Sequence, residues 1–462
     1  MQHTPACTQL NTLALTRSFV LMFWRIFLFY MDFTPLKKLS YDILKLRNVR
    51  FLLVARMLGI LALQSQAVIV GWQIYSLTKD PFMLGLTGLT EAVPAIIGAL
   101  FAGHIVDNHH PQRIYFLCMI ALTLNTFMLL LTAGGIIEVP PDMLIPIIFC
   151  GVFLSGMARC FIAPTSFTLL AWIIPRKNMP SAAAWQSSGF QIAAIGGPAI
   201  SGLVYGQFGA EVAWFIPTCM MFCASIAVWC IRTPDKNKDK KAQMKPKAWT
   251  SIKEGWGFII KNPVLLSVMT IDMFAVLFGG AVAMLPAFAE EILHVGSEGL
   301  GLLRAAPALG AVITALTLAL YPLQTIKGKH LLLVVTGFGI CMIGFGFSTS
   351  FWVAMTFLAL SGAFDSVSMV IRGTLMQFLT PEDMRGRVSS VNSMFIISSN
   401  EIGAFESGVA AKLLGLVPSI VFGGIGTLIV VAVAGTLSPQ LRNSAFRADD
   451  NLVEHKYKKG KP

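Results

Sequence analysis

The sequence contains few charged residues for its length. Asp, Glu, Lys and Arg make up 13% of its 462 residues, about half of the roughly 25% usual in soluble globular domains. Apolar residues reach 55%. So few charges cannot cover the water-facing surface of a soluble chain, which excludes soluble enzymes and soluble nucleic-acid-binding proteins. The composition therefore indicates a membrane protein.

The sequence also lacks the common motifs of catalysis and metal binding. No G-x-x-x-x-G-K-[ST] segment is present, so nucleotide hydrolysis through a P-loop of its own is excluded. H-E-x-x-H and G-x-S-x-G are absent, and the eight cysteines do not have the spacing of metal ligands or of a disulfide framework. We therefore expect no enzyme, no metal and no other cofactor.

Twelve segments are apolar enough to cross a bilayer, which requires about 20 residues. They are predicted to be helices rather than barrel strands, because runs such as residues 331–345 are apolar on both faces. The expected spans are 51–77, 82–106, 113–135, 144–174, 182–206, 213–231, 263–288, 299–323, 330–348, 351–377, 388–414 and 417–438. The predicted fold class is an all-α membrane protein with two pseudo-symmetric six-helix bundles.

One long polar insertion divides the spans six and six. Its second half has Trp and Ile at helical spacing, which predicts a short helix at the lipid headgroups. Either Met1 or Met31 is the expected start of translation. The predicted parts are an N-terminal arm (1–45), a first bundle (46–231), a linker with the interfacial helix (232–262), a second bundle (263–440) and a basic tail (441–462).

Lys and Arg are concentrated in the connections that follow the even-numbered spans. The opposite connections hold mainly acidic residues, such as Glu138, Glu290 and Glu291. The positive-inside rule therefore predicts a multi-pass membrane protein with both termini in the cytoplasm. The expected location is the cell inner membrane. This bias also accounts for the net charge of +12 without nucleic acid as a partner.

The two halves share an internal repeat. Aligning the segments that begin at Gly156 and Gly362 without a gap places Arg159 on Asp365. Repeats of this kind are typical of secondary transporters.

A second alignment, through Pro94 and Pro307, places Glu91 on Arg304. Two pairs of opposite charges thus occupy equivalent positions, which supports a duplication of one six-helix unit.

Away from their ends, every third span contains no ionisable residue. Charged side chains inside a bilayer are costly and normally face a bundle interior or water. The third, sixth, ninth and twelfth helices are therefore expected to face lipid, while the others surround a central path. The charges within these others are Arg56, Glu91, Arg159, Asp272, Arg304, Asp365, Arg372, Glu401 and Glu406.

Over residues 46–440 the chain resembles the major facilitator superfamily, whose members are built in this way. The segment 103–113 is similar to the family's cytoplasmic gating motif through Gly103 and Asp107, followed by Arg113, although Asn108 stands where Arg is usual.

The segment 195–202 resembles a Gly-Pro motif of antiporting members. Its residues Gly196, Gly197, Pro198 and Gly202 predict close helix approach and a local break in the fifth span, at either a rocking interface or a tightly packed one. Further segments, 84–100 and 380–392, resemble the drug and siderophore exporter branch that includes the enterobactin exporter and macrolide efflux pumps.

The carboxylates within the spans are candidates for proton coupling. Burial raises the affinity of a carboxylate for a proton and an approaching cation lowers it, so Asp272, Glu401 and Glu406 are expected either to carry protons or to form fixed ion pairs. Gln191 is a candidate cavity-lining residue.

The remaining charges are candidate pairs. Arg159 and Asp365 are expected either to pair across the cavity or to be satisfied within their own halves. Asp365 and Arg372 lie about 10 Å apart along one helix and are expected not to pair, which leaves Asp365, a further candidate for proton coupling or the cavity, to Arg159 or a substrate. Glu91 and Arg304 belong either to a gate or to helix packing.

The leading functional hypothesis is a proton-coupled exporter of a small amphipathic compound that works by alternating access. The expected partners are a small-molecule substrate, protons and the lipid bilayer, with the protein acting as a monomer. Uptake by symport, the flipping of a lysophospholipid-type molecule and, more distantly, a receptor or scaffold without transport remain open.

Overall fold

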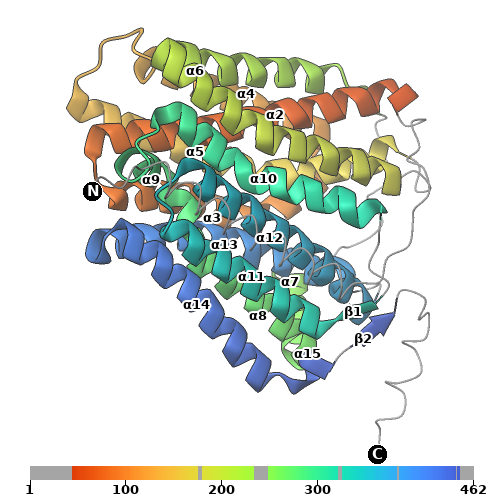
Figure 1. The fold of residues 1–462 in the computed structure, drawn as a ribbon. Helices are drawn as coiled ribbons and strands as arrows, with labels where there is room; N and C mark the ends of the chain where they lie inside the picture. The colour runs from red at the N-terminus through yellow and green to blue at the C-terminus, as the bar shows by residue number, and fades with distance from the viewer. Residues whose placement is uncertain are drawn as a thin grey trace, which may run out of the picture.

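A computed structural model describes residues 44–174, 179–233, 248–320, 325–381, 384–443 and 445–447, and its long helices lie side by side (Figure 1). In this part of the chain ten helical segments are long and apolar enough to cross a membrane. The transmembrane elements are α2 (Arg47–Thr78), α3 (Pro81–Asn108), α4 (Pro111–Thr132), α5 (Pro141–Ile173), α6 (Met179–Trp229), α8 (Pro263–Phe278) with η5 (Gly280–Met284) and α9 (Leu285–Glu291), α10 (Gly296–Leu320), α11 (Gly328–Gly346), α12 (Phe351–Leu379), α13 (Arg385–Leu414) and α14 (Leu416–Leu437).

Two details reconcile these ten segments with the twelve predicted spans. Helix α6 contains two spans, because Gly209 has a φ of 82° and interrupts the helical backbone between them. Helix α13 has 30 residues, which suffice to cross a bilayer, but it carries more polar residues than the other spans. The predicted all-α fold class is therefore confirmed.

The break predicted near Pro198 was wrong. Helix α6 continues through Pro198, and its only non-helical residue is Gly209. Proline is tolerated inside transmembrane helices, whereas a left-handed φ is strained for every residue with a Cβ atom. The helix therefore bends at the glycine between its two spans.

The interfacial helix forms but packs against the bundle. Helix α7 (Ala248–Lys261) contacts α13, where Glu254 pairs with Arg387 at 2.8 Å and the Trp256 ring lies 5.3 Å from that of Phe395. The side chain of Ile259 is fully buried in this contact. Helix α7 is therefore docked on the second half rather than only resting among headgroups.

A small β-ribbon is the one β-sheet in the described residues. Strand β1 (Thr325–Lys327) pairs antiparallel with β2 (Ala445–Arg447), which follows the short helix α15 (Pro439–Asn443). The ribbon joins the connection between α10 and α11 to the chain after α14, and the helical pattern of the sequence did not predict it.

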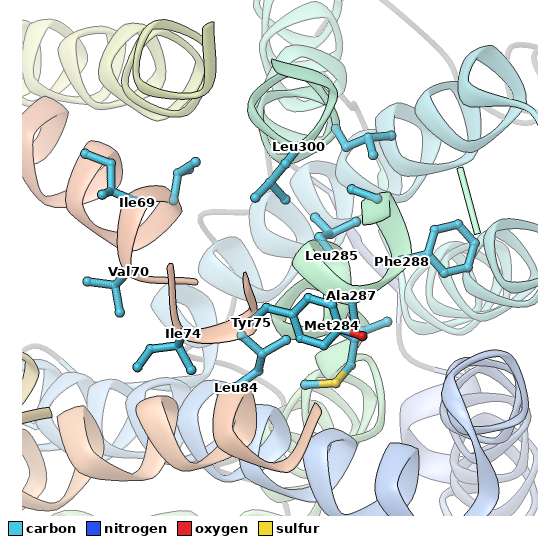
Figure 2. Close-up of a cluster of buried hydrophobic side chains, with 14 of the residues drawn as sticks. Ile69, Val70, Ile74, Tyr75, Leu84, Met284, Leu285, Ala287, Phe288 and Leu300 are labelled. Carbon is cyan, nitrogen blue, oxygen red and sulfur yellow. The ribbon is translucent and has the colours of Figure 1, made fainter. Parts of the chain in front are cut away.

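The two ends of the bundle are packed differently. We call the end where α2 begins and α6 ends the linker end, and the end where α2 ends and α3 begins the loop end. At the loop end, one buried apolar cluster includes residues of both halves (Figure 2). At the linker end, the first and second halves have separate clusters. Figure 2 labels Ile69, Val70, Ile74, Tyr75 and Leu84 from the first half and Met284, Leu285, Ala287, Phe288 and Leu300 from the second.

The internal repeat is visible in the packing. A Cβ atom added at Gly156 would lie 2.9 Å from Cγ of Pro94, and one added at Gly362 would lie 2.6 Å from Cα of Pro307. Each half therefore brings the same glycine of its fourth span against the same proline of its second. The halves thus have matching internal packing, as the alignment of the sequence predicts.

Candidate functional site

The first half contains an ion pair at the two positions that the repeat aligns with Arg304 and Asp365 of the second half. Arg159 of α5 pairs with Glu91 of α3, and the two side chains remain 42% and 22% exposed. In this conformation Arg159 therefore does not pair with Asp365. The two charges of the first half are satisfied within that half, which is the second of the two predicted arrangements.

The second half contains three ionisable groups in contact. Arg372 of α12 pairs with Asp272 of α8, and both side chains are at most 10% exposed. Nη2 of Arg372 also lies 3.9 Å from Oδ1 of Asp365. The expectation that Asp365 and Arg372 do not pair was therefore wrong, because a long arginine side chain spans the distance that separates their backbones.

Asp365 has the weakest ionic contact of the three groups. Its side chain is 44% exposed, and its cationic partner is already engaged by the closer carboxylate of Asp272. Two carboxylates share one guanidinium, so the group carries one surplus negative charge while both acids are ionised. Asp365 is therefore the carboxylate of this group best placed to exchange a proton.

A second group of charges lies where the halves meet. Nη1 of Arg304 on α10 donates a 3.0 Å hydrogen bond to the carbonyl of Ala67 on α2. Glu401 of α13 is close enough to Arg304 and to Arg159 to interact electrostatically with both positive charges. Its carboxylate also approaches α3, since a Cβ atom added at Gly88 would lie 3.5 Å from Oε2.

The repeat is therefore asymmetric in its charges. Glu91 and Arg159 pair in the first half, whereas their counterparts Arg304 and Asp365 bind other partners in the second. Arg304 is held by the backbone of the opposite half. Glu91 and Arg304 were expected to belong either to a gate or to helix packing. Glu91 bonds within its own half, whereas Arg304 bonds to the opposite half.

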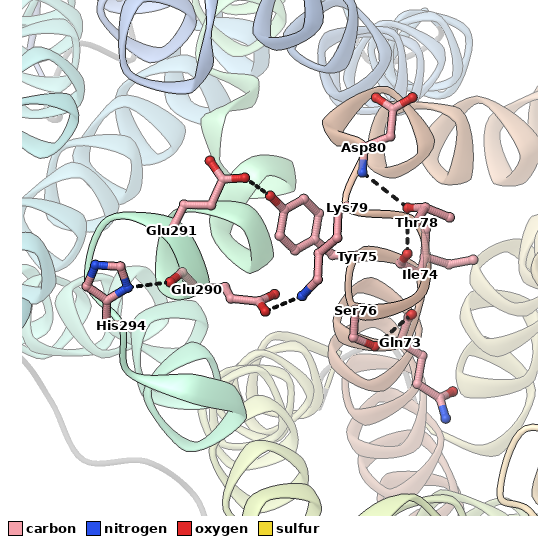
Figure 3. A network of polar contacts seen from close by, with 10 residues as sticks. All are labelled: Gln73, Ile74, Tyr75, Ser76, Thr78, Lys79, Asp80, Glu290, Glu291 and His294. Atoms are coloured by element: carbon pink, nitrogen blue, oxygen red, sulfur yellow. Dashed lines mark hydrogen bonds and ion pairs between the residues drawn. The ribbon is translucent and has the colours of Figure 1, made fainter.

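Polar contacts also join the halves at the loop end (Figure 3). The Tyr75 hydroxyl donates to Glu291, and Lys79 pairs with Glu290. Both contacts link the end of α2 to α9.

A third contact joins α3 to α13 at the same end. Nζ of Lys412 lies 2.9 Å from Oδ2 of Asp80, and this ammonium also lies 5.0 Å from the centre of the Phe82 ring. The hydrogen bond from Lys412 lowers the pKa of the Asp80 carboxyl below its ordinary value. Asp80 also caps α3 by accepting a 3.0 Å hydrogen bond from the backbone of Phe82.

Glycines allow the halves to approach closely at the loop end. A Cβ atom at Gly202 of α6 would lie 2.6 Å from Cα of Gly301 on α10, and one at Gly408 of α13 would lie 2.7 Å from Cα of Gly85 on α3. Small residues at helix interfaces permit such contact between backbones.

The other residues of the Gly-Pro segment pack differently. Gly197 contacts α2, where a Cβ atom would lie 2.8 Å from the Leu61 carbonyl, whereas Gly196 has only Ile200 of its own helix nearby. The carbonyl of Pro198 faces α10, 2.6 Å from the Cβ position of Gly301.

Arg56 was recognised in the sequence as a charge within the first span but was not selected as a site residue. Its Nη1 donates 3.0 Å hydrogen bonds to Oγ of Ser166 on α5 and Oε1 of Gln186 on α6. Among the described residues it has no carboxylate within 4 Å. The signal in the sequence was the absence of any acidic residue from the span that contains it.

The remaining predicted residues have simple surroundings. Glu406 is partly buried on α13 beside the Ser407 hydroxyl, Gln191 is partly exposed on α6, and Arg113 is exposed in the first turn of α4. The backbones of Gly103 and Asp107 belong to the end of α3, and their side-chain surroundings lie outside the described part of the structure. No described group of His, Cys, Asp and Glu side chains could hold a metal ion.

Comparisons with known proteins agree with this arrangement. The model of the Major Facilitator Superfamily matches residues 52–404. The enterobactin exporter EntS of Escherichia coli O1:K1 / APEC is 23% identical over 386 residues, which are 82% of this chain and 89% of the exporter. The exporter of the same name from Shigella dysenteriae serotype 1 (strain Sd197) is 23% identical over 399 residues, covering 85% and 92% of the two chains.

Solved structures have the same fold. The nucleoside transporter NupG superposes with a TM-score of 0.64 at 12% identity, over 85% of this chain and 99% of that one. A variant of the same transporter gives a TM-score of 0.63 at 13% identity. At this level of identity the likeness concerns the fold alone.

Proposed function

Because the chain belongs to the Major Facilitator Superfamily, we propose that it is a proton-coupled exporter of a small amphipathic compound, such as a drug, a siderophore or another secondary metabolite. The chain is a multi-pass membrane protein and a secondary transporter, and the prediction that it is not an enzyme is confirmed by its family. Export, proton coupling and the class of compound belong to the proposal, and the similarity to enterobactin exporters supports them.

The observation that carries the proposal is the unequal packing of the two ends. One apolar cluster joins the halves at the loop end, while separate clusters hold each half at the linker end. Two halves joined at one end can exchange this contact for one at the other end, which is alternating access. In our proposal the linker end and both termini face the cytoplasm, the membrane is the inner membrane, and the protein acts as a monomer with the parts bounded at residues 46–231 and 263–440.

We assign the proton to Asp365. Of the candidate carboxylates, Glu91 and Asp272 each have a direct arginine partner, whereas Asp365 shares its partner and remains partly exposed. Protonation of Asp365 removes the surplus negative charge and leaves Arg372 to Asp272 alone. Glu401 interacts electrostatically with two arginines and is the second candidate.

The repeat suggests how the proton is coupled to the conformation. Glu91 and Arg159 pair in the first half. Because the repeat aligns them with Arg304 and Asp365, the latter two can also pair once Arg304 leaves its present acceptor. Its present acceptor, the carbonyl of Ala67, lies on the opposite half and would move away when the loop end opens. A proton that reaches Asp365 from the loop side neutralises the carboxylate and breaks this pair. Arg304 can then return to Ala67, so a proton taken up from the loop side favours closure of the loop end, as antiport requires.

The proposal is tested in proteoliposomes that contain a pH-sensitive dye, with a panel of fluorescent amphipathic compounds and the protein in a known orientation. We expect some compounds to move toward the loop side while protons move the opposite way, and Asp365→Asn to abolish this proton movement. Glu138→Gln, at an exposed loop position, is the matched control. Movement of compound and proton in the same direction would replace export by uptake symport, and lysophospholipid movement without protons would favour a flippase.

A further inference from the structure

Arg56 holds an unneutralised positive charge inside the first half. It lies nine residues after Arg47, the first residue of α2, and therefore about 14 Å along the helix axis. Its two hydrogen bonds go to the neutral side chains of Ser166 and Gln186. A charge at such a depth normally has an ionised partner or faces a water-filled path.

The neighbours of Arg56 supply unused hydrogen-bond donors. The Tyr115 hydroxyl is fully buried, feels the charge of Arg56, and has no hydrogen-bond partner. Nε2 of Gln186 is also buried and unpaired, although Oε1 of the same amide accepts from Arg56. Buried donors without acceptors are rare in folded proteins, so this group of side chains lacks an acceptor, and a negatively charged one fits best.

The guanidinium is oriented to bind an oxyanion. Both of its hydrogen bonds use Nη1, which leaves the edge formed by Nε and Nη2 without an acceptor among the described residues. Two parallel N–H groups on one edge match the two oxygens of a carboxylate or phosphate.

The position of this group matches the entry of a compound from the linker end. Arg56 remains partly exposed, and its neighbours belong to α4, α5 and α6 of the first half, whose buried cluster at this end is separate from that of the second half. We propose that Arg56 binds the acidic group of the transported compound, with Ser166, Gln186 and Tyr115 completing the subsite. The substrate class is then an amphipathic organic anion, an inference that rests on the proposed function.

The test measures binding rather than transport and uses four naphthalene derivatives that differ in their polar group. These are 1-naphthoate, 1-naphthyl phosphate, naphthalene-1-carboxamide and 1-naphthylmethylammonium, titrated into the purified full-length protein in detergent with thermal stability as the readout. We expect the two anions to bind best, and Arg56→Gln to weaken them about tenfold or more. Arg56→Lys, which keeps the positive charge but not the two parallel N–H groups of the guanidinium, should retain part of the affinity.

Two controls make the result decisive. Arg50→Gln, on the same helix but exposed, should leave all affinities unchanged, and unchanged binding of the carboxamide to Arg56→Gln shows that this variant is folded. Equal binding of anions and carboxamide to the native protein, or anion binding that survives Arg56→Gln, overturns the proposal. Loss of bound phosphatidylglycerol in native mass spectrometry of Arg56→Gln, without any effect of 1-naphthoate, would assign the subsite to a lipid and also overturn it.

Failure of this inference is separable from failure of the proposed function. Compound-driven proton movement that is lost in Asp365→Asn would still support export even if Arg56 binds no anion. Conversely, anion binding at Arg56 without any proton movement would refute coupling and keep the subsite.

Discussion

Replacing Gly202 with alanine should shift the protein away from the conformation described here. The added Cβ atom would lie 2.6 Å from both Cα of Gly301 and the carbonyl oxygen of Ser297. Carbon atoms in good contact lie about 3.5–4.0 Å apart, so the two helices would have to separate by about 1 Å. The obstacle is backbone on α10, which cannot rotate away as a side chain can.

The size of the effect follows from the cost of overpacking. Inserting a methyl group into a tight contact costs about 1–3 kcal/mol. Because Gly202 and Gly301 belong to different halves, this cost applies only while the loop end is closed, and it shifts the equilibrium toward the open form by about 5–150-fold. Gly196→Ala is the matched control, since its nearest neighbour lies 4.0 Å away on the same helix.

The assay is a distance measurement between spin labels across the loop end. Ile137 and Leu413 are exposed positions of opposite halves at this end, and cysteines there can be labelled in a cysteine-free background. We expect longer distances in Gly202→Ala and an unchanged distribution in Gly196→Ala. A folded Gly202→Ala protein with the native distribution would refute the reasoning, as would an equal shift in both variants.

Three further predictions test other parts of the structure. Lys412 lowers the pKa of Asp80 in the closed form. This ion pair therefore stabilises closure above the ordinary pKa of about 4, and the stabilisation is lost as the pH falls through the lowered pKa. The same spin labels should show opening of the loop end on acidification, and Lys412→Met should remove this response. Arg372→Gln leaves a buried carboxylate unpaired and should lower the free energy of unfolding by about 3–5 kcal/mol, measured by denaturation. Gly255→Ala would place a Cβ atom 2.8 Å from a backbone carbonyl of α13, whereas Gly257 has open space, so only the first change should displace α7 and alter the tryptophan fluorescence.

The helices and the repeat could be predicted from the sequence because both depend on local patterns. Spans follow from the length of apolar runs, and the equivalence of Gly156 and Gly362 follows from alignment; the structure places both glycines against the equivalent prolines. The break in α6 was misplaced because proline restricts a helix without breaking it, whereas Gly209 adopts a backbone conformation that other residues avoid.

The ionic partners could not be predicted because they depend on side-chain reach and on conformation. Asp365 contacts Arg372 although their backbones lie about two helical turns apart, and Arg159 pairs with Glu91 of its own half. The contact between Asp80 and Lys412 joins residues separated by 332 positions. Nothing in the local sequence distinguishes such partners. Opposite charges at equivalent positions of the repeat allow several ion pairs, and a single conformation contains only some of them.

The same limit applies to Arg56. Its partners are a serine and a glutamine from two other helices, and neutral residues of this kind are common in transmembrane spans. Only the absence of an acidic residue from its own span was visible in the sequence.

The most direct test of alternating access locks the loop end and measures transport. Asp80→Cys and Lys412→Cys, in a cysteine-free background, place thiols at two positions of opposite halves whose native side chains lie in contact. A reducible bis-methanethiosulfonate reagent whose spacer matches the distance between the two shorter side chains can join them. Compound-driven proton movement in proteoliposomes should disappear after cross-linking and return when the reagent is reduced. Full proton movement in the cross-linked protein would contradict the account.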